Sequence, residues 1–107
     1  MASIGEYIHA DGASGTGVRQ AQDKLGNLID PHGGAAKIGY QITITGGTAT
    51  VEIRAGRSGA RAAGEMQVLR TVTASEMNAI VIPCPEFDFN ITANTGSVTL
   101  KSWSTVQ

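Results

Sequence analysis

The sequence predicts an all-β protein, either an antiparallel β-sandwich or a jelly-roll-like barrel of about six to eight strands. Thr, Val and Ile number 23 from residue 38 onward against 5 before it, so we expect the strands in the C-terminal two thirds. Glycine shows the opposite trend, because 7 of the 14 glycines lie in the first 37 residues, where they oppose regular structure. We therefore expect residues 1–36 to form a glycine-rich N-terminal arm and residues 37–107 to form the β-sandwich domain.

Two hairpins are predicted from alternating apolar and polar residues. The first joins residues 38–45 to residues 48–55 through Gly46-Gly47, which favours a tight primed turn with positive φ. The second joins the strand around residues 87–93 to a last strand that begins at Val98, with Asn, Thr, Gly and Ser in the turn between them. These hairpins supply four of the expected strands.

The remaining elements are shorter. A glycine-rich loop over residues 56–64 precedes a strand over residues 66–72, in which Leu69 breaks the alternation and predicts a β-bulge. Residues 79–82 form a short strand that ends at Pro83-Cys84-Pro85, because proline cannot donate to a strand ladder. Residues 18–29 have apolar side chains at helical spacing around Gly26, which leaves one short helix possible.

Composition argues against several classes of partner. Eight basic residues against nine acidic ones give a net charge of −1, so no broad positive surface for nucleic acid is expected. No stretch approaches the roughly 18 apolar residues of a membrane span, and the N-terminus lacks the features of a secretion signal. The single cysteine, Cys84, cannot form an intrachain disulfide and is expected to pack as a small apolar side chain.

The motifs that resemble catalytic or ligand-binding sequences are incomplete. The segment Gly12–Gly17 has the outer glycines of a phosphate-binding loop, but Val18-Arg19 follows where Lys and Ser or Thr are required. Ser14 and Ser58 lack the spacing of a nucleophile elbow. We therefore expect no enzyme, no catalytic residue and no cofactor.

Two histidines fall in the predicted arm. His9 lies near Asp11 and His32 near Asp30, but no cysteine pair, His-x-x-x-His motif or carboxylate cluster completes a metal site. We expect both histidines at the surface with no metal bound, and a metal that bridges subunits of an oligomer stays open as the alternative.

Three groups of residues are candidates for contact with a partner. Arg57 and Arg61 give the glycine-rich loop a basic character that could receive a carboxylate or phosphate, although ordinary solvated charge is the alternative. Trp103 is opposite in phase to Val98 and Leu100, so it should face away from the core. The arm contributes apolar side chains that its own glycine-split segment cannot bury, and it should become ordered only against a neighbour. The candidate contacts are Ile4, Tyr7, Ile8, Arg57, Arg61 and Trp103.

From about Gln41 to Trp103 the sequence resembles small β-sandwich virion proteins of tailed bacteriophages, especially capsid decoration (cement) and head-fibre subunits. The similar segments are residues 49–53, the glycine-rich loop, residues 69–74, residues 85–93 and residues 96–100. The resemblance implies a non-enzymatic sandwich, often a trimer, that sits on a shell of major capsid protein. The arm has no counterpart in that family.

These observations predict a structural protein of a bacteriophage particle, made in the host cytoplasm and not secreted, that stabilises the capsid shell. A small core without disulfides favours a homo-oligomer, with a trimer implied by the resemblance. The partners are then other copies of the chain and the major capsid protein or another virion protein. A carbohydrate-binding or receptor-binding module of a fibre tip or baseplate is the alternative, and a small enzyme is the second alternative.

Overall fold

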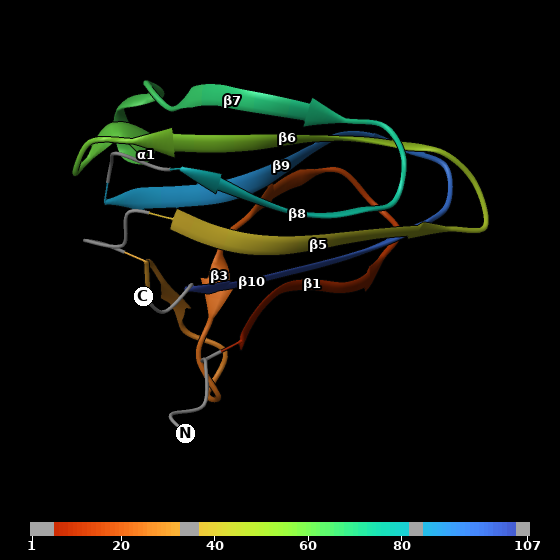
Figure 1. Cartoon of the computed structure of the whole chain (residues 1–107), viewed down its shortest axis with the longest axis horizontal. Helices are drawn as coiled ribbons and strands as arrows, with labels where there is room; N and C mark the ends of the chain where they lie inside the picture. Colours follow the sequence, from red (N-terminus) through yellow and green to blue (C-terminus); the bar gives the residue numbers. More distant parts are fainter. Residues whose placement is uncertain (1–5, 33–36, 82–84, 105–107) are drawn as a thin grey trace.

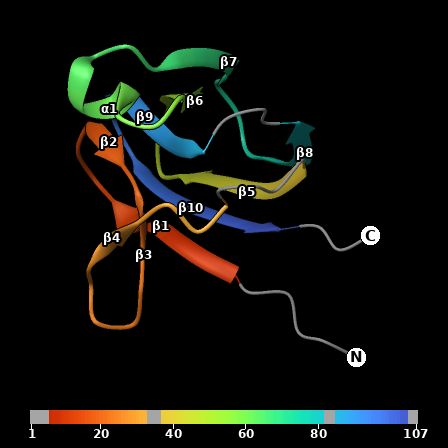
Figure 2. The same cartoon turned by 90° about the vertical axis from the view of Figure 1, so that its left-hand side faces the viewer.

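The protein consists of two antiparallel β-sheets that pack face to face, as the computed structural model shows (Figures 1 and 2). The structure describes residues 6–32, 37–81 and 85–104. The six-stranded sheet has the order β4-β3-β1-β10-β5-β8, and the four-stranded sheet has the order β2-β9-β6-β7. The strands of the first sheet are β1 (Glu6–Ala13), β3 (Ala21–Gln22), β4 (Leu28–Ile29), β5 (Lys37–Thr45), β8 (Glu76–Val81) and β10 (Ser97–Ser104). Those of the second are β2 (Gly17–Arg19), β6 (Ala49–Gly56), β7 (Gln67–Val72) and β9 (Glu86–Asn94). The predicted all-β sandwich is confirmed.

The order of the strands is that of a jelly roll. When the short β3-β4 pair is set aside, the chain runs from β1 to β2, from β5 to β6, from β7 to β8 and from β9 to β10, and each of these steps leads from one sheet to the other. Eight strands arranged in this way form two Greek keys. These connections join the two layers, whereas β6 and β7 are consecutive neighbours within the four-stranded sheet.

Neither predicted hairpin forms. β5 pairs with β10 and β8, while β6 pairs with β7 and β9, so the Gly46-Gly47 segment connects two different sheets. The connection from β9 to β10 likewise leaves one sheet for the other. The alternation correctly located these strands and their buried faces. It could not distinguish a hairpin from a crossover, because both leave the same side chains facing the core.

Three of the crossovers meet at one end of the sandwich, on the right of Figure 1. The Thr95 amide donates to the Thr48 carbonyl at 2.8 Å, and the Thr48 amide donates to Thr95 Oγ1 at 2.9 Å. Asn94 Nδ2 donates to the Ala13 carbonyl at 2.9 Å and so ties in the β1-β2 connection. Gly46 has φ +71°, which confirms the predicted positive φ in this segment.

Two glycines at these crossovers are expected to resist substitution to different degrees. Gly46→Ala should cost about 1 kcal/mol, because an L-residue is strained at positive φ. Gly96→Ala should cost about 1–3 kcal/mol, because its methyl group would overlap the Thr45 carbonyl oxygen in a packed connection. Urea denaturation measures both. Gly15→Ala is the control, since the nearest atom to its added Cβ would be 4.0 Å away. Wild-type stability of Gly96→Ala would contradict the close approach of the two crossovers.

The core lies between the two sheets and is built from the inward faces of the long strands. Its largest fully buried apolar or aromatic side chains are Tyr40, Phe87, Phe89, Ile38, Ile42, Ile53, Ile91, Leu100 and Val51. The predicted bulge in β7 is confirmed, because Ile53 pairs with Arg70 and Arg54 pairs with Val68, which leaves Leu69 without a partner.

The structure places much of the predicted arm inside the sandwich. β1 lies between β10 and β3 in the interior of the larger sheet, and β2 pairs with β9 in the other sheet. The register of β1 against β10 shifts twice, between Ile8 and Ala10 and again between Ala10 and Ala13. Each bulge resets the alternation, so no strand pattern was visible in the sequence. The rest of the predicted arm, residues 1–5 and 33–36, lies outside the described residues, as does Cys84.

The helix considered over residues 18–29 does not form. These residues supply β2, β3 and β4, and Leu25 and Leu28 are 86% and 62% exposed. Within the described ranges the one helix is α1 (Ala60–Ala63), which lies in the glycine-rich loop and ends at Gly64 with φ +72°. The helical spacing of apolar residues was therefore a coincidence of short strands and exposed leucines.

Candidate functional site

An apolar patch covers part of the outer face of the six-stranded sheet, centred on Trp103. Trp103 pairs with Gly39 on the neighbouring strand, and Gly39 in turn pairs with Ala79 of β8. A Cβ on Gly39 would overlap the Trp103 indole, so the ring lies directly across the glycine backbone. The absence of a side chain at Gly39 is what lets the indole lie flat on the sheet.

Further apolar side chains on the same face extend this patch. Met77 and Val81 lie two residues on either side of Ala79 and are 66% and 64% exposed. Ile8 is 45% exposed and pairs with Lys101, two residues from Trp103. We name the six residues Ile8, Gly39, Met77, Ala79, Val81 and Trp103 the Trp103 face.

The inner side of the same sheet holds a buried chain of hydrogen bonds. Ser102 Oγ lies 2.7 Å from His9 Nε2 and 2.7 Å from His32 Nε2, and all three residues are at most 2% exposed. His9 Nδ1 lies 2.9 Å from the Arg19 carbonyl oxygen, and His32 Nδ1 lies 3.0 Å from Ser104 Oγ. The histidines predicted at the surface are therefore interior residues, and that prediction is wrong.

The donor and the acceptor of each hydrogen bond in this series follow from the Arg19 carbonyl, which can only accept. His9 must carry its proton on Nδ1, so the neutral ring accepts from the Ser102 hydroxyl at Nε2. Ser102 Oγ then accepts from His32 Nε2–H, and His32 Nδ1 accepts from the Ser104 hydroxyl. Every polar atom of both rings is satisfied when both rings are neutral.

Burial strongly favours the neutral rings. The pKa of His9 is lowered from 6.5 to about 4, chiefly by burial; the bond to the Arg19 carbonyl raises the pKa and the nearby His32 lowers it, and the net result is this value. Burial also lowers the pKa of His32, against the opposing charge of Asp30. Phe87 and Phe89 pack edge-on against His9, with ring centroids 5.9 and 4.7 Å away. These histidines link β1, β10 and the segment after β4 inside the sandwich.

A second polar cluster lies around Asp88, which is fully buried. Its carboxylate accepts from Arg54 Nε at 2.7 Å and from Arg61 Nε at 2.6 Å. Arg61 also donates to both carboxylate oxygens of Asp30, at 2.8 and 3.0 Å. Burial lowers the pKa of Arg61, but the bonds to Asp30 and Asp88 outweigh burial and raise it. The cluster fastens the segment after β4 and the start of α1 to the four-stranded sheet.

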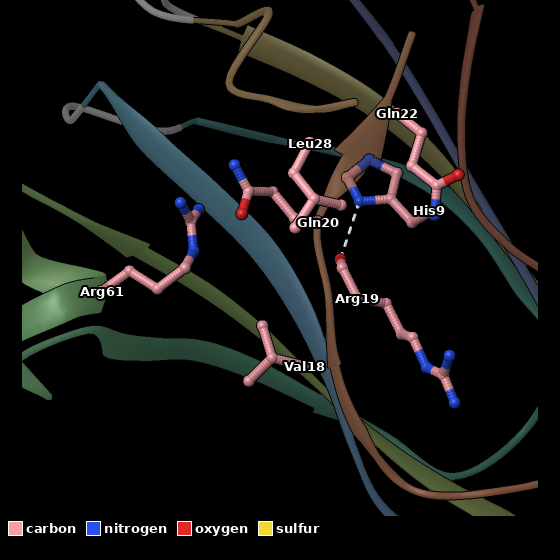
Figure 3. A pocket seen from close by; sticks show the side chains of 7 residues that line it. All are labelled: His9, Val18, Arg19, Gln20, Gln22, Leu28 and Arg61. Carbon is pink, nitrogen blue, oxygen red and sulfur yellow. Dashed lines mark hydrogen bonds between the residues drawn. The ribbon is translucent and has the colours of Figure 1, made fainter. Parts of the chain in front are cut away.

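A cleft of about 380 Å³ lies between these two clusters (Figure 3). It is lined by His9, Val18, Arg19, Gln20, Gln22, Leu28 and Arg61. His9 is engaged by the Arg19 carbonyl and Ser102, and Arg61 is engaged by its two carboxylates. Among the described residues the buried Nε of Arg19, which also lines the cleft, has no hydrogen-bond partner. The described residues contain no group of three or more His, Cys, Asp or Glu side chains that could hold a metal ion.

The predicted partner contacts have different surroundings in the structure. Ile8 and Trp103 lie together on the Trp103 face, while Tyr7 faces inward and packs edge-on against His32 at 5.4 Å. Arg57 is mostly exposed and pairs with Glu65, whereas Arg61 is held by Asp30 and Asp88.

Ile4 lies outside the described residues. The sequence reasoning did not single out Met77 or Val81 as contacts. Their signal was present in the short, uncharged apolar stretch that follows Glu76.

The fold and the Trp103 face define a jelly-roll sandwich with an apolar patch on the outer side of its six-stranded sheet. Comparison of the chain with protein-family models, with curated proteins and with solved structures found no match. In the part of the chain that the structure describes, no helix is long and apolar enough to cross a membrane.

Proposed function

We propose that this protein is a non-enzymatic structural subunit of a bacteriophage particle, a capsid decoration protein that binds the shell through its Trp103 face. The observation that carries the proposal is the Trp103 indole lying across Gly39, with exposed Ile8, Met77 and Val81 around it. Soluble domains rarely leave a contiguous apolar surface without a partner, and tryptophan is among the residues that contribute most to interfaces.

The fold and the sequence resemblance support the same proposal. Jelly rolls with two Greek keys are common in viral capsid proteins, although lectins and cupins share the architecture, so this support is by analogy. The resemblance to decoration subunits covers residues 41–103, which include most of the Trp103 face. The low charge of the chain also keeps the cost of desolvating such a contact small.

A sugar-binding module would also expose an aromatic ring, and the neighbours of Trp103 separate the two functions. The cross-strand and adjacent outward positions carry Gly39, Glu6, Lys101 and Gln41. Glu6 and Lys101 face each other with 3.7 Å between Oε1 and Nζ. These neighbours make the surface around Trp103 a flat apolar platform bordered by charged side chains. Such a platform is better suited to contact with another protein than to binding the hydroxyl groups of a sugar.

Trp103→Ala is expected to weaken binding to phage particles at least about 30-fold while the fold persists, because a central tryptophan commonly contributes 2 kcal/mol or more. The measurement is cosedimentation of the full chain with particles from its source that were prepared without this protein. Circular dichroism checks the fold of each variant. Leu25→Ala is the matched control, since Leu25 is 86% exposed on the loop between β3 and β4 and is not one of the six residues of the Trp103 face.

Saturable binding by the wild type and by Leu25→Ala, with loss in Trp103→Ala, supports the proposal. Equal binding by Trp103→Ala would remove the Trp103 face from the contact. Failure of the wild type to bind particles, together with binding to host-surface glycans, would favour the receptor-binding alternative.

A further inference from the structure

We infer that two copies of this chain pair through strand β8, edge to edge about a two-fold axis, and extend the six-stranded sheet into one continuous sheet. Figure 1 labels β8, which is the last strand in the order of the larger sheet and has β5 on one side only. This goes beyond the proposed function, because it concerns contact between copies of the chain and not contact with the particle.

The four sheet edges differ in how well they are protected against such pairing. β4 has two residues and β2 has three, which is too short to template a long partner strand. β7 carries the bulge at Leu69, which discourages pairing. β8 has six residues that pair with β5 without any shift in register. Within the described strands β8 is therefore the long, regular and unprotected edge.

Charge does not protect β8 either. Its sequence is Glu-Met-Asn-Ala-Ile-Val, and its one charged residue, Glu76, stands at the start. Arg70 of β7 donates to both oxygens of this carboxylate, at 2.8 and 2.5 Å, and Tyr40 donates its hydroxyl to it. The charge of Glu76 is thus neutralised within the subunit, and the other five residues offer a neutral edge.

The outward backbone groups have the parity that antiparallel pairing requires. The Ala79 amide donates to the Oδ1 atom of Asn78 at 2.8 Å, which is a local substitute for an absent neighbour strand. Residues 77 and 81 have the same parity as residue 79 and direct their amides to the same side. A register centred on Ala79 then places Ala79 of both copies opposite each other, with their amides and carbonyls exchanging hydrogen bonds.

This register is self-complementary in its side chains. Met77 of one copy lies opposite Val81 of the other, and the reverse pair follows from the symmetry. Both side chains are about two-thirds exposed in the single chain and lie on the outer face of the sheet. Pairing would place them side by side on that face, and no like charges would meet among residues 77–81. A two-fold axis normal to the sheet also puts both Trp103 faces on the same side, so a decoration subunit would present a doubled contact surface.

The test is the mass of the full chain in solution by analytical ultracentrifugation, for the wild type and for charge variants. The wild type is expected at twice 11.0 kDa. Met77→Lys combined with Val81→Lys should give a monomer, because lysine would then face lysine across the axis. Met77→Lys combined with Val81→Glu should restore the dimer, because each lysine would face a glutamate. Within one chain residues 77 and 81 are about 13 Å apart along the strand, so restoration requires the second copy.

One control variant and two further measurements keep the result specific. Leu69→Lys, at the β7 edge, is the matched control and should remain a dimer. Circular dichroism should be unchanged in all variants, because positions 69, 77 and 81 are exposed. The amides of Met77 and Val81 in the wild type should exchange faster with deuterium when the protein is diluted.

A wild-type monomer, or a wild-type trimer of three times 11.0 kDa as the resemblance implies, would overturn the inference. The inference would also be overturned if the variant with Met77→Lys and Val81→Lys remained a dimer. The same holds if the variant with Met77→Lys and Val81→Glu failed to form a dimer. Loss of particle binding in Trp103→Ala with an intact dimer separates this inference from the proposed function.

Discussion

Asp88→Asn is expected to lower the free energy of unfolding by about 3 kcal/mol or more, the largest effect of any single substitution considered. Asp88 is fully buried, and its carboxylate neutralises Arg54 and Arg61, whose side chains are only 16% and 19% exposed. The amide keeps the shape of the carboxylate but removes its charge. Arg54 would then be left nearly buried without a counter-charge, while Arg61 would keep Asp30. A loss of this size is a large fraction of the stability of a small domain.

The measurement is urea denaturation of the variant beside the wild type, with circular dichroism at 25 °C to detect unfolding in the absence of urea. Glu65→Gln is the matched control, because it removes one carboxylate charge from the Arg57–Glu65 ion pair, whose side chains are 66% and 54% exposed. Exposed pairs contribute at most about 1 kcal/mol, so this control should remain close to the wild type. Equal effects of the two substitutions would show that the Asp88 cluster does not fasten α1 to the sheet.

Acidification from pH 7 to pH 5 should destabilise the protein by about 2 kcal/mol through His9 alone. Its pKa is about 4 in the folded protein and 6.5 in the unfolded chain, so the unfolded chain binds more protons between these values. The stability that the neutral ring provides is therefore complete above pH 6.5 and decreases as the pH falls toward 4. The pKa of His32 is also lowered, mainly by burial, and this acts in the same direction.

Urea denaturation at several pH values between 5 and 8 measures this dependence. Carboxyl groups with lowered pKa, namely Asp23, Glu76 and Glu86, have ordinary values of 4.5 or below, so they contribute chiefly below this range. His9→Gln cannot take up a proton and should show a shallower dependence on pH, together with lower stability at pH 7. A variant with the same slope as the wild type, or a wild type with constant stability, would show that His9 is not held neutral.

The sequence indicated the long strands and their inward faces because side-chain alternation is a local property. Residues 38–45, 49–56 and 86–94 alternate as the structure has them, and Trp103 faces outward as its phase predicted. The bulge at Leu69 and the positive φ of Gly46 are also local, and both were confirmed.

Two of the six residues of the Trp103 face were within reach of the same reasoning. Ile8 and Trp103 were expected as contacts, but Gly39 and Ala79 become part of the face only through strand pairing. The register that lays the indole on Gly39 joins residues 64 positions apart, and no feature of either segment specifies that partner. Sites assembled across strands in this way require the sheet order to be known first.

The sequence by itself determined that this chain is a β-sandwich with alternating strands from residue 38 onward. Only the tertiary structure decided which strands are neighbours, that β1 is an interior strand, and that His9 and His32 are joined through Ser102. The physical reason is that alternation reports which face of a strand is buried, whereas neighbours are chosen by contacts distant in the sequence. Where bulges interrupt the alternation, as they do twice in β1, and where polar side chains satisfy one another in the core, the local pattern contains no sign of burial.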